Sequence, residues 1–351
     1  MKRTLGTLGL VLLVVGSCGG SSPREVSPGS PASNAGSPGR DVSRLEPIVL
    51  VADVLDEPAE WEPVTSVPFG EANRALSYEP SDESGPIQPR SFSVAPDGSF
   101  WILDPGKERA AHFSRSGTFL EAIRHLGPDL QDVVFLGDSM LILQSQDGLV
   151  VLVDRDGGLT YAVINDGQDP VQLRELVASG ERIFAQVGDP IDGGEEGGRG
   201  FARVELPGSG LATPVPGLPT GRRTWVLPFA SGSQDLEIRY IGDEMSLVQS
   251  IHIEMRRGDA LLEGVAGPGN YGVVDRDLTA LIAISASAEG EPEQLGGRWL
   301  LRIGEGPLLW ERLPNPSIDD DQQVRHIAAG PDGSLYLMVQ TRDGVRILRR
   351  P

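Results

Sequence analysis

The residues best placed to do chemistry are carboxylates that gather in three long segments between short apolar runs. These segments, 188–200, 286–297 and 314–323, are rich in glycine, proline and acidic residues. Carboxylate oxygens suit hard divalent cations such as calcium, and a cluster of them also attracts a basic partner. We therefore predict an acidic binding rim made of Glu195, Glu196, Glu289, Glu291, Glu293, Asp319, Asp320 and Asp321.

The charge of the whole chain supplies a simpler explanation of that rim. The sequence holds 50 Asp and Glu against 30 Lys and Arg, for a formal net charge of −20. Surface loops of such a chain are acidic whether or not they bind anything. The same balance repels phosphate backbones and anionic lipids, so nucleic acid is an unfavourable partner.

One run of residues matches the spacing of a cofactor-binding motif, but the residues that follow it do not fit that motif. The run Gly267-Pro268-Gly269-Asn270-Tyr271-Gly272 has the spacing of a dinucleotide-binding turn. That turn must lead into a helix whose N-terminus meets the pyrophosphate, whereas residues 273–285 have the pattern of a turn and a strand. We interpret the run as a loop between strands and predict no nucleotide cofactor.

Metal-ligating histidines are scattered. Of His112, His125, His252 and His326, His326 alone opens a strand predicted to line the centre of the fold. A histidine cluster around a metal is therefore not predicted, although a divalent cation such as calcium remains compatible with the acidic rim. The sequence predicts no other cofactor.

The N-terminus carries a targeting signal. Lys2 and Arg3 precede an apolar run at 4–15 that is too short to span a bilayer, and Val15-Gly16-Ser17-Cys18 follows. This segment resembles the lipobox of bacterial lipoproteins, which implies removal of residues 1–17 and lipidation of Cys18. Cys18 is the single cysteine of the chain. The resemblance implies a location in the cell envelope, on the extracytoplasmic side of a membrane. The alternative is an ordinary secretory signal with a chance cysteine near its end.

Residues 18–44 link that signal to the rest of the chain. They are rich in Ser, Pro, Gly and Asn and nearly free of large apolar side chains. Such a composition is typical of a disordered tether, with a reach of roughly 25–30 Å.

The elements that must position the loops are short strands. Residues 91–123 contain four apolar runs, with Pro96-Asp97-Gly98 separating the first two and Arg115-Ser116-Gly117 the last two. Both tripeptides are turn formers, so this stretch predicts a four-stranded antiparallel meander. A second Pro-Asp-Gly turn stands at 331–333, and Asp97 and Asp332 lie 235 residues apart, or five intervals of 47.

That spacing predicts a six-bladed β-propeller over residues 45–351, in the all-β class. We place the four intervening turns at 137–138, 179–180, 232 and 275–277. The last blade runs out of chain after three strands, so an N-terminal strand, 47–54 or 62–69, must complete it and close the ring. A seven-bladed ring and a β-sandwich are the alternatives.

The first predicted blade resembles an NHL-type repeat at Pro96, Asp97, Gly98, Trp101, Asp104, Arg109, Phe113 and Gly117, and residues 324–350 match more weakly. Propellers of this kind act mostly as binding platforms, and a minority are lactonases or lyases. The resemblance thus implies a membrane-anchored binding or scaffolding module whose partner is an envelope protein or a small ligand. The alternative is a channel-centred, lactonase-like hydrolase or lyase, in which a divalent metal has a place.

Overall fold

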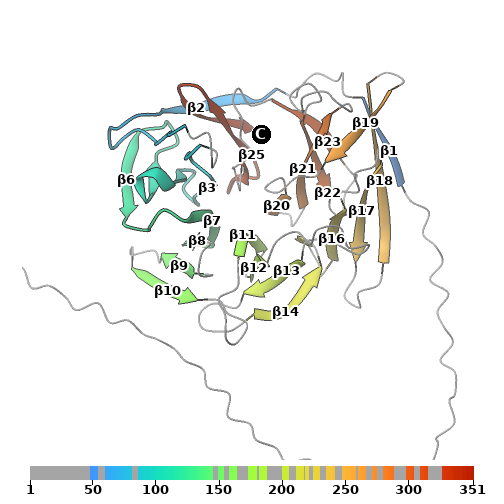
Figure 1. Cartoon of the computed structure of the whole chain (residues 1–351), viewed down its shortest axis with the longest axis horizontal. Coiled ribbons are helices and arrows are strands. Elements are labelled where there is room, and N and C mark those ends of the chain that lie inside the picture. Colours follow the sequence, from blue (N-terminus) through green and yellow to red (C-terminus); the bar gives the residue numbers. More distant parts are fainter. Residues whose placement is uncertain are drawn as a thin grey trace, which may run out of the picture. The chain divides into compact units, whose positions relative to one another are not determined.

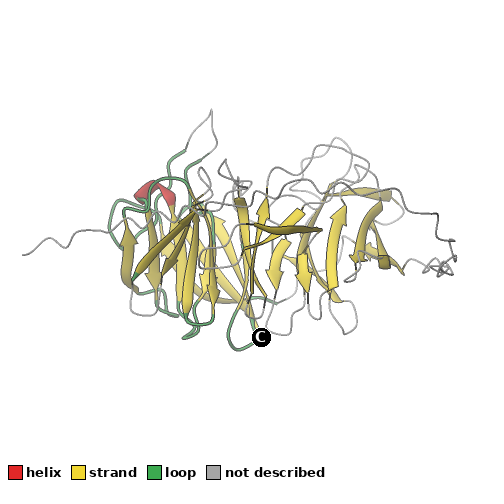
Figure 2. Cartoon of the chain, turned by 90° about the horizontal axis from the view of Figure 1, so that it is seen from below, coloured by secondary structure: helices red, strands yellow, loops and turns green. Residues whose placement is uncertain are grey.

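The computed structural model of the chain describes residues from Ile48 onward, with gaps. The described ranges are 48–53, 60–80, 86–144, 149–153, 158–163, 173–179, 182–187, 200–204, 211–216, 218–220, 224–229, 235–241, 247–257, 260–265, 271–274, 280–287, 298–303, 309–314 and 326–351. Leu45–Pro351 is one compact unit. Within the described ranges it is built of strands and one short 3-10 helix, as the all-β prediction requires (Figure 2).

The first complete sheet is the predicted meander. It has the order β3 (Phe92–Val94), β4 (Phe100–Asp104), β5 (Arg109–Phe113) and β6 (Phe119–Arg124), with η1 (Pro105–Lys107) between β4 and β5. The turn from β3 to β4 is tight because Asp97 accepts the Ser99 backbone N–H at 2.9 Å and Gly98 takes a φ of 82°.

Two further meanders confirm the predicted four-stranded antiparallel sheets. The second has the order β7 (Leu130–Leu136), β8 (Ser139–Gln144), β9 (Leu149–Val153) and β10 (Leu159–Val163). The third has the order β11 (Leu173–Ser179), β12 (Arg182–Val187), β13 (Gly200–Val204) and β14 (Leu211–Pro216). Leu136 pairs with Ser139 and Ser179 pairs with Arg182, which agrees within one residue with the turns predicted at 137–138 and 179–180.

The C-terminal sheet joins the two ends of the compact unit. Its order is β24 (Ile327–Ala329), β25 (Leu335–Thr341), β26 (Gly344–Arg350) and β2 (Glu62–Pro68). Of the two strands proposed to complete this sheet, β2 does so, pairing antiparallel with β26 from Glu62↔Arg349 to Pro68↔Gly344. The other, β1 (Ile48–Asp53), instead runs parallel to β18 (Leu247–Arg257).

The fourth and fifth groups of strands form one ten-stranded sheet rather than two separate ones. Its path is β15 (Leu218–Thr220), β16 (Thr224–Phe229), β17 (Asp235–Ile241), β18, β19 (Ala260–Val265), β21 (Ala280–Ser287), β22 (Arg298–Ile303) and β23 (Leu309–Leu313). β1 joins at β18, and β20 (Tyr271–Val274) joins at β21. β19 bridges the two halves because its first residues pair with β18 and its last with β21.

The prediction for the fourth group missed one strand at its start. We expected its first strand to be at 225–230, followed by a turn at Gly232. The short strand β15 precedes that run, pairs with it and contacts β11 and β20. Pro219 and the brevity of β15 hide it from a search for alternating apolar runs.

Apolar side chains fill the spaces between consecutive sheets. One core cluster lies between the first and C-terminal sheets and includes Phe92, Ile102, Tyr336 and Ile347. A second joins the first and second sheets, and a third joins the second and third. Because each fully buried large apolar side chain contributes about 1.5–3 kcal/mol, these clusters are the main stabilising element of a chain with no second cysteine.

The first strands of successive groups contact one another. The contacts run from β24 to β3, from β3 to β7, from β7 to β11, from β11 to β20 and from β20 back to β24, and the short β15 contacts both β11 and β20. Figure 1 shows β3, β7, β11 and β20 facing a common centre. In the part of the chain that the structure describes, no helix has the length and apolar character needed to cross a membrane.

Candidate functional site

A layer of buried polar residues lies at the same position of four first strands. One pair in from the residues that close each hairpin are Val94↔Phe100, Phe135↔Met140, Ala178↔Ile183 and Ala329↔Leu335. Three residues before the first member of each pair stand Ser91, Asp132, Glu175 and His326. All four are buried, with exposed fractions of 0%, 0%, 2% and 2%. We call this set the polar layer.

Asp132 links three sheets through its carboxylate. Ser91, which precedes β3, donates its hydroxyl to Asp132 Oδ1 at 2.6 Å. The N–H of Val133 on β7 donates to the same oxygen at 2.8 Å, and the N–H of Leu176 on β11 donates to Oδ2 at 2.8 Å. Both oxygens therefore accept donors that hold neighbouring strands together, which is a stabilising role for a buried carboxylate.

Glu175 on β11 and His326, which precedes β24, complete the polar layer. Each has an exposed fraction of 2%, and each interacts with another group. Across the described residues, no group of three His, Cys, Asp or Glu is placed to hold a metal ion.

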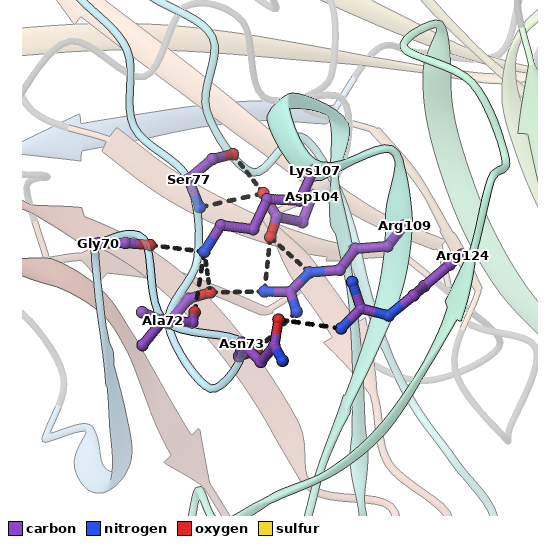
Figure 3. Close-up of polar contacts among 9 residues, drawn as sticks. Gly70, Ala72, Asn73, Ser77, Asp104, Lys107, Arg109 and Arg124 are labelled. Atoms are coloured by element: carbon purple, nitrogen blue, oxygen red, sulfur yellow. Dashed lines mark hydrogen bonds and ion pairs between the residues drawn. The ribbon is translucent and has the colours of Figure 1, made fainter.

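A second polar centre fixes the loop that enters the first sheet. Asp104 at the end of β4 and Arg109 at the start of β5 form an ion pair of 2.8 Å, and neither side chain is exposed. Ser77 donates both its backbone N–H, at 3.0 Å, and its hydroxyl to Asp104 Oδ1. The carboxylate thereby ties residue 77 of the incoming loop to the sheet, as Figure 3 shows.

Three cations hold the rest of that loop, residues 70–77. Lys107 Nζ donates to the carbonyl oxygens of Gly70, Ala72 and Ala75 at 2.5, 3.0 and 2.7 Å (Figure 3). Arg109 donates to the Asn73 carbonyl at 2.6 Å, and Arg124 donates to the Asn73 side-chain oxygen at 3.2 Å. Burial lowers the pKa of Lys107, while Asp104 acts to raise it. We call this set of contacts the loop clamp.

A third arrangement has the residue types of a nucleophile, a base and an acid. His112 Nε2 lies 2.7 Å from Ser99 Oγ, and His112 Nδ1 lies 3.4 Å from Glu121 Oε1. The Ser99 hydroxyl, however, donates to Asp97 Oδ1 at 2.5 Å. Since its single proton is used there, Ser99 accepts from His112 and is not activated as a nucleophile in this geometry.

The residues of the predicted acidic rim lie outside the described part of the chain, as does Cys18. This applies to Glu195, Glu196, Glu289, Glu291, Glu293, Asp319, Asp320 and Asp321. At the dinucleotide-like run, Tyr271–Val274 forms β20, a strand where that motif requires a helix.

The polar layer and the loop clamp were not predicted as sites. A signal for the layer was present, because Ser91, Asp132, Glu175 and His326 stand four or five residues before the predicted hairpins. No comparable signal marked the loop clamp, since its acceptors are backbone carbonyl oxygens.

Comparisons with known proteins give one family match and several distant structural likenesses. Residues 59–165, which include β2 and the first two sheets, match the family model described as "Domain of unknown function (DUF7485)". A comparison with curated proteins gives no match.

Three solved structures illustrate the structural likeness. A gluconolactonase from Xanthomonas campestris is 13% identical, with 85% of this chain and 99% of that chain covered and a TM-score of 0.48. The WD40 β-propeller domain of Doa1 is 10% identical, with 83% and 97% covered and a TM-score of 0.45. A virginiamycin B lyase from Staphylococcus aureus is 10% identical, with 76% and 96% covered and a TM-score of 0.42. A likeness at this level assigns no activity to the chain.

Proposed function

We propose that residues 45–351 form a six-bladed, NHL-type β-propeller, closed by β2, that presents a binding face to a partner in the cell envelope. Six successive groups of strands support six blades around one axis, since the first strands β24, β3, β7, β11, β15 and β20 each contact their neighbours and β11 also contacts β20. The pairing of β2 with β26 supports closure, because it joins strands from opposite ends of the unit.

The bridge made by Asp132 is the observation that carries the binding function. Its carboxylate, at the centre of the polar layer, is committed to hydrogen bonds that hold three sheets together. A frame fixed in this way keeps the ends of its strands in place, and a rigid scaffold that carries variable loops is the usual arrangement of binding surfaces.

The binding face lies at the end of the strands that carries the long insertions. The loop clamp fixes one loop, 70–77, at this end of the first sheet, with residues 71–74 exposed. The insertions at 188–200, 286–297 and 314–323 add the carboxylates of the acidic rim. A basic protein surface or a divalent cation such as calcium fits that charge.

A charge-removal variant tests the binding face. Asp319, Asp320 and Asp321 are replaced together by Asn in the full chain, and capture of basic envelope proteins is measured beside calcium binding by calorimetry. We expect at least one of the two to weaken about tenfold or more when three carboxylates of one site are neutralised. A triple Asn variant at Asp97, Asp138 and Asp332, in the hairpins at the opposite end, removes the same charge and should retain binding. Equal binding by both variants contradicts the acidic rim.

The lipid anchor is tested separately. If Cys18 carries the acyl chains that its lipobox resemblance implies, Cys18→Ala should move the protein from the membrane fraction to the soluble fraction, because each buried CH₂ contributes about 0.8 kcal/mol. Mass spectrometry of the mature N-terminus supplies the direct measurement. Retention of Cys18→Ala in the membrane fraction contradicts anchoring by Cys18.

A lactonase-like hydrolase or lyase is the second candidate, and the polar layer favours it. Glu175 and His326 are buried titratable groups at matching positions of first strands, where a channel site would be built. Activity on a panel of lactones, with and without added divalent metal, tests this function. Turnover that Glu175→Gln and His326→Gln abolish in folded protein would favour the enzyme over the binding module.

A further inference from the structure

The first and C-terminal sheets carry the same hairpin with a different basic residue at one position. Both hairpins have the sequence Pro-Asp-Gly-Ser, at 96–99 and 331–334. On the following strands His112 lies opposite Trp101, and Arg349 lies opposite Tyr336. His112 and Arg349 are therefore at equivalent positions in the two sheets, each opposite an aromatic residue.

Arg349 clamps its hairpin with two hydrogen bonds. Its Nε donates to Ser334 Oγ at 3.1 Å, and a terminal nitrogen donates to Asp332 Oδ2 at 3.0 Å. Asp332 in turn accepts the Ser334 backbone N–H at 3.0 Å. Because a guanidinium stays charged at all ordinary pH values, this clamp does not depend on protonation.

His112 occupies the matching position with a ring that can lose a proton. Its Nε2 faces Ser99 Oγ at 2.7 Å, its Nδ1 faces Glu121 Oε1 at 3.4 Å, and its ring stacks on Trp101 with centroids 4.3 Å apart and an interplanar angle of 10°. The charged side chains that face it are Asp97, from the hairpin, and Glu121, from β6. β4 contributes the uncharged Trp101 ring.

Counting hydrogens shows which form of the ring these contacts require. The Ser99 hydroxyl donates its proton to Asp97, so the Ser99 oxygen must accept from His112 Nε2. The Glu121 carboxylate can only accept. The doubly protonated ring donates to both oxygens. A neutral ring has one N–H, so it must give up one of the two contacts, and it also loses the attraction between a cation and the Trp101 π-face.

We propose that His112 makes the hairpin clamp of the first sheet proton-dependent, whereas Arg349 makes the equivalent clamp of the C-terminal sheet permanent. Deprotonation of His112 releases Ser99 in the hairpin, because the ionised carboxylate of Glu121 is the stronger acceptor and keeps the remaining N–H. The first sheet therefore loosens at its hairpin end as pH rises, while the C-terminal sheet does not respond.

Amide hydrogen exchange in the full chain tests the proposal, with the C-terminal sheet as an internal control. Protection factors of the Ser99 and Ser334 amides are compared between pH 5 and pH 8, the range in which histidines ordinarily change charge. We expect the protection of Ser99 to fall roughly 2- to 10-fold at the higher pH, as the loss of one hydrogen bond implies. The protection of Ser334 should stay constant.

The variant His112→Arg isolates the residue from the other three histidines. It installs the cation of the C-terminal sheet, so the difference between the two pH values at Ser99 should disappear. If this variant does not fold, ring nitrogen NMR of the wild type decides, since it counts the protons on His112 directly. Equal protection of Ser99 at both pH values, the same step in His112→Arg, or a singly protonated His112 ring at pH 5 overturns the proposal.

Discussion

The first and C-terminal sheets are alike at their hairpin ends and differ at the opposite ends. At the hairpin end both have a Pro-Asp-Gly-Ser turn held by the side chain of its aspartate. At the other end Asp104 pairs with Arg109 in the first sheet, and Val339 pairs with Arg346 at the matching position of the C-terminal sheet. The residue near the end of the second strand therefore differs: Asp104 in the first sheet forms a buried ion pair, and Val339 in the C-terminal sheet cannot.

The difference follows from where each ladder stops. In the first sheet the β4–β5 ladder ends at Asp104↔Arg109, Pro105 begins η1, and Lys107 reaches the loop at 70–77. In the C-terminal sheet the ladder continues to Thr341↔Gly344, and the longer β26 pairs with β2. Proline cannot donate a hydrogen bond to a ladder, so Pro105 ends the β4–β5 ladder of the first sheet.

The largest expected effect is at the buried ion pair, which has no counterpart in the C-terminal sheet. Replacing Arg109 with Met leaves Asp104 buried without its cation and removes the donors to Asn73 and Ala75. Removal of one partner from a buried pair costs about 3–5 kcal/mol, which urea unfolding should show as a loss of unfolding free energy.

The control for that variant lies at the equivalent position of the C-terminal sheet. Arg346 is exposed, so Arg346→Met should change the free energy of unfolding by no more than about 0.5 kcal/mol. Similar losses of unfolding free energy for the two variants would show that the Asp104–Arg109 ion pair contributes no more to stability than the exposed Arg346.

Most of the strand arrangement could be predicted because the turns are encoded locally. Pro96-Asp97-Gly98 specifies its hairpin through the φ of proline, the aspartate side chain and the freedom of glycine, and Pro331-Asp332-Gly333 repeats it. The parallel pairing of β1 with β18 could not be predicted, because it joins residues about 200 positions apart without a turn between them.

The sites were harder to predict because their geometry depends on pairing between sheets. In the sequence, Asp132 is an ordinary aspartate at the start of a strand. Its hydrogen bonds to Ser91 and Leu176 form only when β7 lies between β3 and β11. Lys107 is bound by carbonyl oxygens of residues 70, 72 and 75, which any side chains at those positions would supply. Sequence patterns report side chains, so a site built on backbone atoms leaves no mark in them.

An intermediate effect is expected at the glycines of the two matched hairpins. Gly98 and Gly333 have φ values of 82° and 81°, and a Cβ added at either would meet no atom within 4 Å. The cost of alanine there is the left-handed backbone alone, about 1–2 kcal/mol. Thermal unfolding of Gly98→Ala and Gly333→Ala should show equal losses, and unequal losses would mean that the two hairpins are not equivalent.

A smaller effect is expected for the Asp332–Arg349 pair, whose side chains are 39% and 24% exposed. A double-mutant cycle of Asp332→Ala and Arg349→Ala should give a coupling energy of about 0.2–1 kcal/mol, the range for solvent-exposed pairs. Measured by chemical denaturation, a coupling well above that range would show that the clamp of the C-terminal sheet contributes more than its exposure predicts.

The smallest expected effect is the acid response of the two hairpin aspartates. The pKa of Asp97 lies below its ordinary value, first because the Ser99 hydroxyl donates to it. Burial alone would raise the pKa of Asp332, but the Ser334 donors and the Arg349 guanidinium lower it below its ordinary value. A carboxyl whose pKa falls on folding stabilises the protein above its unfolded-state pKa, about 3.9.

That contribution is lost as pH falls through the lower folded-state pKa, so wild-type stability should decrease below about pH 4. Asp97→Asn and Asp332→Asn should each make the decrease shallower in urea unfolding between pH 6 and pH 2. Ser99→Ala should reduce the response of the first sheet only, because its hydroxyl is the largest cause of the Asp97 shift. Unchanged slopes in both Asn variants would mean that the shared hairpin motif fixes the local geometry without an electrostatic contribution to stability.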